Sequence, residues 1–179
     1  NHAEKGSEFT LSHVIYSDDA GKTWRRGGTV GARTDESSVV ELAGGALLIN
    51  MRNNRGRGLR AVARSRDRGA TWDSVEFDEA LLDPTCQGSL ISVGRNLLLF
   101  SNAADPKRRV RLTVRMSRNE GRTWPVSRLI CEGPSAYSSL AALKDSTIAL
   151  LFERGAQNFR ETITFARFNM EWLGDRRAP

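Results

Sequence analysis

The sequence predicts an all-β protein assembled from four-stranded units, the blades of a β-propeller, and two kinds of repeat predict it. The first is an eight-residue phrase of the form S-x-D-x-G-x-T-W, which begins at Ser17, Ser65 and Ser117. The second is a pair of short apolar strands that recurs between the phrases. Repeats of about 40–50 residues, with four short strands each, are typical of propeller blades.

The repeated phrase has the chemistry of a tight turn. Its aspartate, replaced by Asn119 in the third copy, can accept hydrogen bonds from the backbone ahead of it, and its glycine supplies a positive φ. The serine and threonine hydroxyls can close the turn, and the tryptophan can anchor it to the blade. We therefore interpret the phrases as structural elements and expect Asp19 and Asp67 to face outward.

The paired strands lie between the phrases in a common register of constant length. The three segments are ESSVVELAGGALLINMR from Glu36, CQGSLISVGRNLLLFSN from Cys86 and YSSLAALKDSTIALLFE from Tyr137. Each reads as a short apolar strand, a turn and a longer apolar strand. A third strand follows in each unit (LRAVARS, VRLTVRMS and TITFARFN), and a weaker fourth strand follows each phrase.

The two ends of the chain fall inside such units. FTLSHVIYS, from Phe9, reads as the third strand of an incomplete blade, and FNMEWLGD, from Phe168, stands where a fourth phrase would be expected. The chain thus holds about three and a half blades. Because propellers close with about 4–8 blades, we expect residues 1–179 to form a partial domain that further blades complete.

Composition narrows the function less than the repeats do. The formal net charge is +6, and 23 of the 27 basic residues are arginines. A basic surface suits nucleic acid, anionic lipid or an acidic substrate. Many of these arginines lie in the turns, without an aromatic platform between them, so we do not expect nucleic-acid binding. Examples are Arg66, Arg68, Arg118 and Arg122.

Neither metal chemistry nor membrane insertion is indicated. Cys86 and Cys131 have no metal-ligand spacing, and we expect neither a metal nor a cofactor. No apolar run reaches the ~18 residues of a membrane-spanning helix. No signal peptide is visible, so the sequence leaves the compartment open.

Functional residues of a repeat protein are expected where equivalent positions differ. The first residues of the three aligned segments are Glu36, Cys86 and Tyr137, and the last residues are Arg52, Asn102 and Glu153. In a radial fold these positions should lie at similar height, so that their side chains converge. A further exception is Arg115, two residues before its phrase, where the other units have apolar residues. A charge is costly to bury without a partner, which favours a role for Arg115.

These side chains predict a particular chemistry. Guanidinium groups bind a carboxylate through paired hydrogen bonds. A phenol, with a pKa of ~10, is a poor nucleophile unless a base takes its proton, and Glu36 or Glu153 could do so. The combination suits transfer at an anomeric carbon that itself bears a carboxylate, where a carboxylate nucleophile would be repelled and a neutral phenol would not. Sialidases are the glycosidases that use tyrosine in this way.

Five segments carry a resemblance to a known family. DESSVVEL, NMRN, DPTCQGSL, VRMS and AYSSL, in this order, resemble the exo-α-sialidases (neuraminidases) with BNR, or Asp-box, repeats, over essentially the whole chain. The resemblance implies a six-bladed propeller that removes terminal sialic acid from glycoconjugates with retention of configuration. It also favours a secreted or cell-envelope protein.

The resemblance implies a role for each matching residue. Tyr137 would be the nucleophile and Glu36 its base, while Arg52 and Arg115 would be two members of an arginine triad that holds the sialic acid carboxylate. Glu153 would orient the first triad arginine, and Gln87 would line the pocket near the sugar's side chains or serve as a turn residue. Neither the first triad arginine nor the aspartate that acts as general acid is found in this chain.

Other functions remain open at this point. A non-catalytic Asp-box propeller that binds glycans or partners would keep the fold. A trans-sialidase, or a hydrolase for a related nonulosonic acid, would keep the fold and much of the site. Because a general acid contributes ~10²–10⁴-fold, this chain alone is expected to be a poor catalyst.

Overall fold

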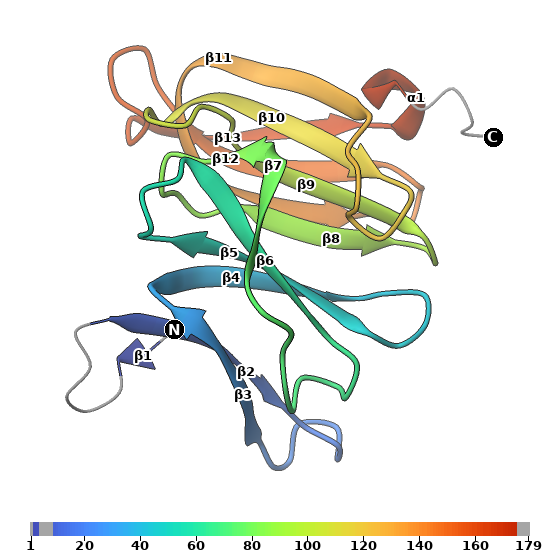
Figure 1. The fold of residues 1–179 in the computed structure, drawn as a ribbon. Helices are drawn as coiled ribbons and strands as arrows, with labels where there is room; N and C mark the ends of the chain where they lie inside the picture. The colour runs from blue at the N-terminus through green and yellow to red at the C-terminus, as the bar shows by residue number, and fades with distance from the viewer. Residues whose placement is uncertain (1, 4–8, 175–179) are drawn as a thin grey trace.

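The computed structural model describes residues 2–3 and 9–174, and almost all of its regular structure is strand (Figure 1). A three-stranded sheet comes first, formed by β1 (His2–Ala3), β2 (Thr10–Tyr16) and β3 (Arg25–Ala32). A complete four-stranded blade follows, formed by β4 (Thr34–Glu41), β5 (Leu47–Asn53), β6 (Leu59–Ser65) and β7 (Glu76–Leu82). The predicted all-β class is confirmed.

The rest of the chain forms a second complete blade and part of another. The strands are β8 (Ser89–Val93), β9 (Leu97–Ala103), β10 (Val110–Ser117), β11 (Val126–Ala142), β12 (Ile148–Arg154) and β13 (Thr162–Phe168). They form one hydrogen-bonded series because β11 pairs first with β10 and then, from Ser135 onward, with β12. The long β11 thus serves as the outer strand of one blade and the first strand of the next. The expected total of about three and a half blades matches these sheets.

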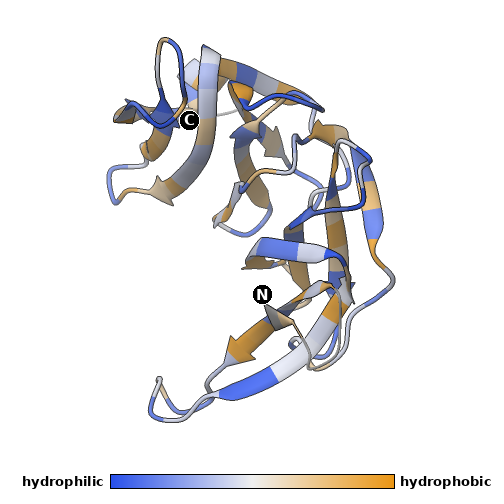
Figure 2. Ribbon diagram, turned by 90° about the vertical axis from the view of Figure 1, so that its left-hand side faces the viewer, coloured by the Kyte–Doolittle hydropathy of each residue, from blue (hydrophilic) through white to orange (hydrophobic). Residues whose placement is uncertain are grey.

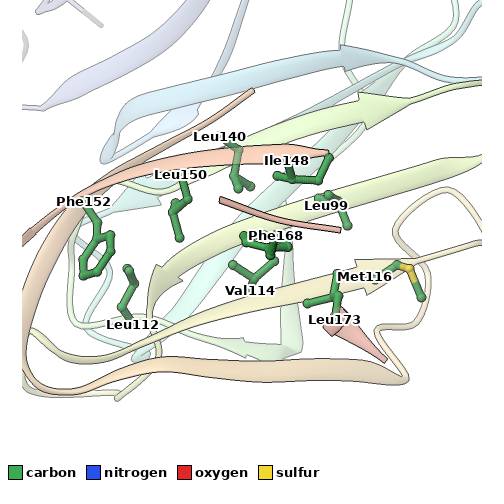
Figure 3. Close-up of a cluster of buried hydrophobic side chains, with 10 residues drawn as sticks. All are labelled: Leu99, Leu112, Val114, Met116, Leu140, Ile148, Leu150, Phe152, Phe168 and Leu173. Carbon is green, nitrogen blue, oxygen red and sulfur yellow. The ribbon is translucent and has the colours of Figure 1, made fainter. Parts of the chain in front are cut away.

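Apolar side chains of neighbouring sheets pack against one another and hold successive blades together. In the largest cluster, side chains from β9 to β13 and from the short helix α1 (Met170–Leu173) point toward one another (Figure 3). Leu112 and Leu150 are completely buried there. The segment FNMEWLGD, which replaces a fourth phrase, forms this helix and places Leu173 in the core. Its last residue, Asp175, lies outside the described residues.

No helix in the described part of the chain is long and apolar enough to cross a membrane.

The three phrases form the same turn, as predicted. In the second copy, the Ser65 hydroxyl donates to the Asp67 carboxylate and accepts from the Gly69 N–H. The Asp67 carboxylate also accepts from the N–H and the hydroxyl of Thr71. The carboxylates of Asp19 and Asp67 lie at the surface, away from the blade interior.

The tryptophans of the second and third phrases pack toward the preceding sheet. The Trp124 indole N–H donates to Asp78 of β7 at 2.9 Å, and Trp72 lies against Gly28 of β3. Trp24, which belongs to the first sheet, is 60% exposed. The anchoring predicted for the tryptophans therefore holds where a preceding blade is present.

The first strands of successive blades lie side by side, and the ribbon follows an open arc (Figure 2). Side chains link these strands across the blade boundaries. The Ser38 hydroxyl of β4 donates to the Gly88 carbonyl at 3.2 Å, and the Leu140 N–H of β11 donates to the Ser89 hydroxyl at 3.0 Å. The blades therefore have a fixed relation to one another near the axis of the arc.

The register of the middle unit differs from the predicted one. Glu41 pairs with Leu47 and Ala142 with Ile148, whereas Val93 pairs with Leu97, so the middle hairpin turn is two residues shorter. When the pairing of β8 with β9 is extended by one residue beyond Ser89 and Ser101, Gly88 lies opposite Asn102, whereas Cys86 does not. Cys86 is therefore not equivalent to Glu36 and Tyr137, because it precedes the strand and is completely buried.

Candidate active site

Two irregularities at the same place in two blades position the residues that begin the register. The pairing of β4 with β5 shifts between Thr34 and Ser37, and that of β11 with β12 shifts between Ser135 and Ser138. Bulges of this kind bend a strand and change the direction of a side chain, and they are frequent beside active sites. Glu36 lies within the first irregularity and Tyr137 within the second.

Glu36, Arg52 and Tyr137 meet although they come from different blades. The Tyr137 hydroxyl donates to Glu36 Oε1 at 2.5 Å. Arg52 Nη1 donates both to Glu36 Oε2 at 2.9 Å and to the Tyr137 oxygen at 3.2 Å. The phenol is therefore in contact with a carboxylate that can accept its proton and with a cation that stabilises negative charge on its oxygen.

The protonation states of this group follow from its contacts. Burial and the hydrogen bond to the Glu36 carboxylate raise the pKa of Tyr137, so its hydroxyl keeps its proton at neutral pH. Burial acts to raise the pKa of Glu36, but hydrogen bonds from Tyr137 and Arg52 and the charges of Arg52 and Arg109 outweigh it and lower that pKa. Glu36 is therefore an ionised acceptor next to a neutral phenol, as general-base assistance requires.

Arg109 brings a second positive charge to the site. Its guanidinium carbon lies 5.7 Å from the centre of the Tyr137 ring, and Nη2 donates to the Thr85 carbonyl at 3.3 Å. The loop that carries it is fixed by Asp105, whose carboxylate accepts from two backbone N–H groups, and by a Ser135 N–H bond to the Arg109 carbonyl. The sequence reasoning did not select Arg109.

The expectation that Arg115 converges on this group is wrong. In the sheet, Arg115 of β10 pairs with Phe100 of β9, which precedes Asn102 by two residues. The Arg115 Nη1 donates to the Asn102 side chain at 3.3 Å. Burial lowers the pKa of Arg115, and the charge of Asp78 in the preceding blade opposes this shift. Within the described residues, Arg115 makes no hydrogen bond or ion pair with Glu36, Arg52 or Tyr137.

A directional argument could have found Arg109 in the sequence. β9 runs toward the site and ends with the Asn102 position, so the following strand β10 runs away from it. Residues just before β10 must therefore lie nearer the site than residues late in it. Arg109 is the residue directly before β10, whereas Arg115 is near its far end.

Gln87 and Glu153 hold the backbone around the tyrosine. The Gln87 side chain donates to the Ser138 carbonyl at 3.0 Å and accepts from the Ser138 N–H at 2.9 Å, so both ends of its amide are occupied. Glu153 Oε2 accepts from the Tyr137 N–H at 3.2 Å. Both residues line a cavity of about 350 Å³ beside Tyr137, together with Leu151 and Ile163.

The described residues contain no group of three or more His, Cys, Asp or Glu side chains arranged to hold a metal ion. The nearby thiol of Cys86 is unsuited to nucleophilic chemistry because burial raises its pKa to about 11.

Comparison with known proteins places the chain in a family. The family model of the BNR repeat-like domain matches residues 2–150. A sialidase of Micromonospora viridifaciens is 43% identical over 174 residues, which cover 92% of this chain and 26% of that protein. A sialidase of Bacteroides fragilis is 39% identical over 151 residues, which cover 78% of this chain and 28% of that protein. This chain therefore spans little more than a quarter of the length of these two relatives.

A solved structure extends the likeness to three dimensions. The Hadza microbial sialidase Hz136 superposes with a TM-score of 0.79 at 37% identity, over 88% of this chain and 32% of that one. Repeats, blades and sequence identity point to one assignment: the chain belongs to the sialidase family with BNR repeats, and its sheets are blades of a sialidase β-propeller.

Proposed function

We propose that this chain is the part of an exo-α-sialidase that carries the nucleophile, and that the enzyme removes terminal sialic acid from glycoconjugates with retention of configuration. The observation that carries the proposal is the 2.5 Å hydrogen bond from the Tyr137 hydroxyl to the Glu36 carboxylate, with Arg52 bonded to both. A neutral phenol with an ionised base suits a substrate whose reacting carbon bears a carboxylate, because that substrate would repel a carboxylate nucleophile.

In the proposed reaction the Tyr137 oxygen attacks the anomeric carbon as the bond to the leaving oxygen breaks. The phenolic proton passes to Glu36, and a protonated group outside this chain supplies the proton for the leaving oxygen. Water then attacks the anomeric carbon and gives a proton to the group outside this chain, the bond to the Tyr137 oxygen breaks, and Glu36 returns its proton to that oxygen. Two displacements at one carbon restore the original configuration.

Arg52 and Arg109 are the proposed ligands of the substrate carboxylate. Both guanidinium groups lie beside Tyr137, and both lower the pKa of Glu36 through their charge. The buried Arg52 Nε lies 4.0 Å from the Asp35 carboxylate, and Nη1 donates to both Glu36 and Tyr137, so the guanidinium is fixed beside the phenol. Glu153 is proposed to orient a further arginine, because its carboxylate makes just one hydrogen bond in the described part of the chain.

The general acid and the first triad arginine are assigned to blades beyond this chain, which complete a six-bladed ring. The outer face of the last sheet supports this assignment. Leu151 is 48% exposed, whereas Asn50 and Phe100, which hold the same row in the two complete blades, are 1% and 0% exposed. Ile163 is 75% exposed on the same face. A further blade would bury these side chains as the complete blades bury theirs.

Hydrolysis of a fluorogenic α-sialoside, measured with the complete protein and with this chain alone, tests the proposal. We expect turnover by the complete protein and little or none by the chain, because a general acid contributes about 10²–10⁴-fold. The absence of turnover by a folded complete protein that still binds sialosides would favour a non-catalytic glycan-binding propeller instead. Analysis of the released sugar separates hydrolysis from transfer to a second sugar.

A further inference from the structure

The loop between β12 and β13, residues 155–161, lies outside the group of Glu36, Arg52 and Tyr137 and is held in shape by one of its own carboxylates. The Glu161 carboxylate accepts three backbone N–H groups of this loop, from Ala156, Gln157 and Asn158, at 2.7–2.9 Å. These bonds lower the pKa of Glu161, so the loop keeps its shape as long as the carboxylate is ionised. The residue that the loop presents next is Phe159.

Phe159 lies against the arginine that reaches the tyrosine. The Arg109 guanidinium carbon is 5.2 Å from the centre of the Phe159 ring and 5.7 Å from the centre of the Tyr137 ring. Arg160 contacts the same phenylalanine ring at 5.1 Å. A guanidinium in contact with an aromatic face is attracted by its quadrupole, and the interaction restricts a side chain that otherwise has many rotamers.

Besides the two ring contacts, the Arg109 side chain makes one hydrogen bond within the described residues, so most of its N–H donors have no acceptor there. Nη2 donates to the Thr85 carbonyl, and Thr85 has a φ of 59°, which is uncommon for a β-branched residue. The Phe159 ring offers no acceptor oxygen that could compete with a ligand, and among the described residues Arg109 makes no hydrogen bond to the Tyr137 oxygen. Arg109 is thus fixed mainly by contacts that leave its remaining N–H donors available.

We propose that Phe159 is a positioning residue: the carboxylate-bound loop 155–161 holds its ring against Arg109, and this contact fixes the guanidinium in the orientation that binds the substrate carboxylate. The inference rests on the proposed function. It predicts a loss of binding specific to the carboxylate when the ring is removed, because Phe159 acts through Arg109 alone.

The test uses the complete protein and the inhibition constant of 2-deoxy-2,3-didehydro-N-acetylneuraminic acid, which bears the carboxylate. Phe159→Leu should weaken inhibition about 3- to 30-fold, the scale of one cation–π contact, and should raise KM more than it lowers kcat. Phe159→Tyr keeps an aromatic face and should restore both values to within about twofold of the unchanged protein. Arg160→Ala is the matched control, since it contacts the same ring on the exposed loop, and it should change neither value by more than about twofold.

A double substitution separates positioning from general damage. In an Arg109→Ala background, Phe159→Leu should add no further loss of inhibition, because the residue that it positions is gone. Additive losses in the double variant, or an unchanged inhibition constant in Phe159→Leu, would overturn the inference. Failure of the unchanged complete protein to hydrolyse α-sialosides would instead count against the proposed function.

Discussion

At the residue scale, the chemistry depends on two charges that act on one phenol. The pKa of Glu36 is lowered because Tyr137 and Arg52 donate hydrogen bonds to it, and the pKa of Tyr137 is raised by burial and by its hydrogen bond to that carboxylate. The contact therefore widens the pH range over which an ionised carboxylate and a neutral phenol coexist. The pair is a single titrating unit, so a change to either member changes both.

Tyr137→Phe in the complete protein is the direct test of the nucleophile. The substitution removes one oxygen and keeps the ring near Arg109, so binding of the inhibitor should change by less than about fivefold. Turnover of an α-sialoside should fall by about 10²-fold or more, the scale on which acid–base chemistry contributes. Turnover within tenfold of the unchanged protein would remove Tyr137 from its assigned role.

Arg109→Ala and Arg115→Ala form a matched pair that distinguishes the site from the blade interface. Loss of Arg109 should weaken inhibitor binding by roughly 30-fold, because truncating a charged group that pairs with a ligand carboxylate costs about 2 kcal/mol or more. Loss of Arg115 should lower the melting temperature and leave the inhibition constant within about twofold, because its side chain donates to Asn102 and not to the group around Tyr137. The reverse pattern would restore Arg115 to the carboxylate site.

At the scale of single elements, each turn phrase is a small hydrogen-bonded unit, and in the second phrase these bonds shift the pKa of Asp67. Hydrogen bonds from Thr71 and Ser65 lower the pKa of Asp67 to about 2 from an ordinary 3.8. A carboxyl whose pKa is depressed in the folded state contributes stability that is complete above its ordinary pKa. That contribution is lost as the pH falls through the folded value.

Asp67→Asn should therefore lower the melting temperature of the complete protein at neutral pH, and the deficit should shrink as the pH falls from 3.8 to about 2. The third phrase shows that asparagine can form the turn, since Asn119 accepts from the Thr123 N–H at 2.9 Å. Arg66→Gln is the control, because it removes a neighbouring surface charge without altering the turn. A deficit that stays constant over this pH range would contradict the assignment.

The strands that carry the site owe their precision to irregularity. Regular alternation would place Glu36 and Tyr137 as ordinary members of β4 and β11, but the shifted pairing in each strand changes their direction. Arg52 and Glu153 lie on the partner strands opposite these shifts. The same kind of irregularity in two blades therefore positions both the proposed base and the proposed nucleophile.

At the scale of the whole molecule, the open arc exposes at its ends what its interior blades bury. Trp124 is 9% exposed against the preceding blade, whereas Trp24 is 60% exposed. At the other end, the outer face of β12 and β13 presents Ile163 and Phe165, which are 75% and 59% exposed. Both ends therefore expose apolar side chains of the kind that the interior blades bury against one another, as the proposed six-bladed ring requires.

Ile163→Asp in the complete protein tests that continuation. If a further blade covers this face, a carboxylate placed in the contact should lower the melting temperature by several degrees, since burying an unpaired charge is costly. Leu129→Asp is the control, because Leu129 is 38% exposed on the outer half of β11, where no further blade is expected. Equal and small effects of the two substitutions would mean that the face stays in water.

The sequence alone determined the features that depend on local chemistry. The turn phrases, the short alternating strands and their spacing predicted the all-β class and the blades, because turn geometry and strand pairing depend on neighbouring residues. The positions of Glu36, Arg52 and Tyr137 followed from comparing equivalent places in the repeats, and the structure brings these three together.

Only the tertiary structure decided which arginine completes the group. Arg109 reaches Tyr137 because β10 runs away from the site and because a loop of another blade holds its guanidinium. The shorter middle hairpin likewise moved Cys86 out of the expected register. Contacts between residues far apart in the chain depend on turn lengths, bulges and strand direction summed over three blades, and no local pattern in the sequence records that sum.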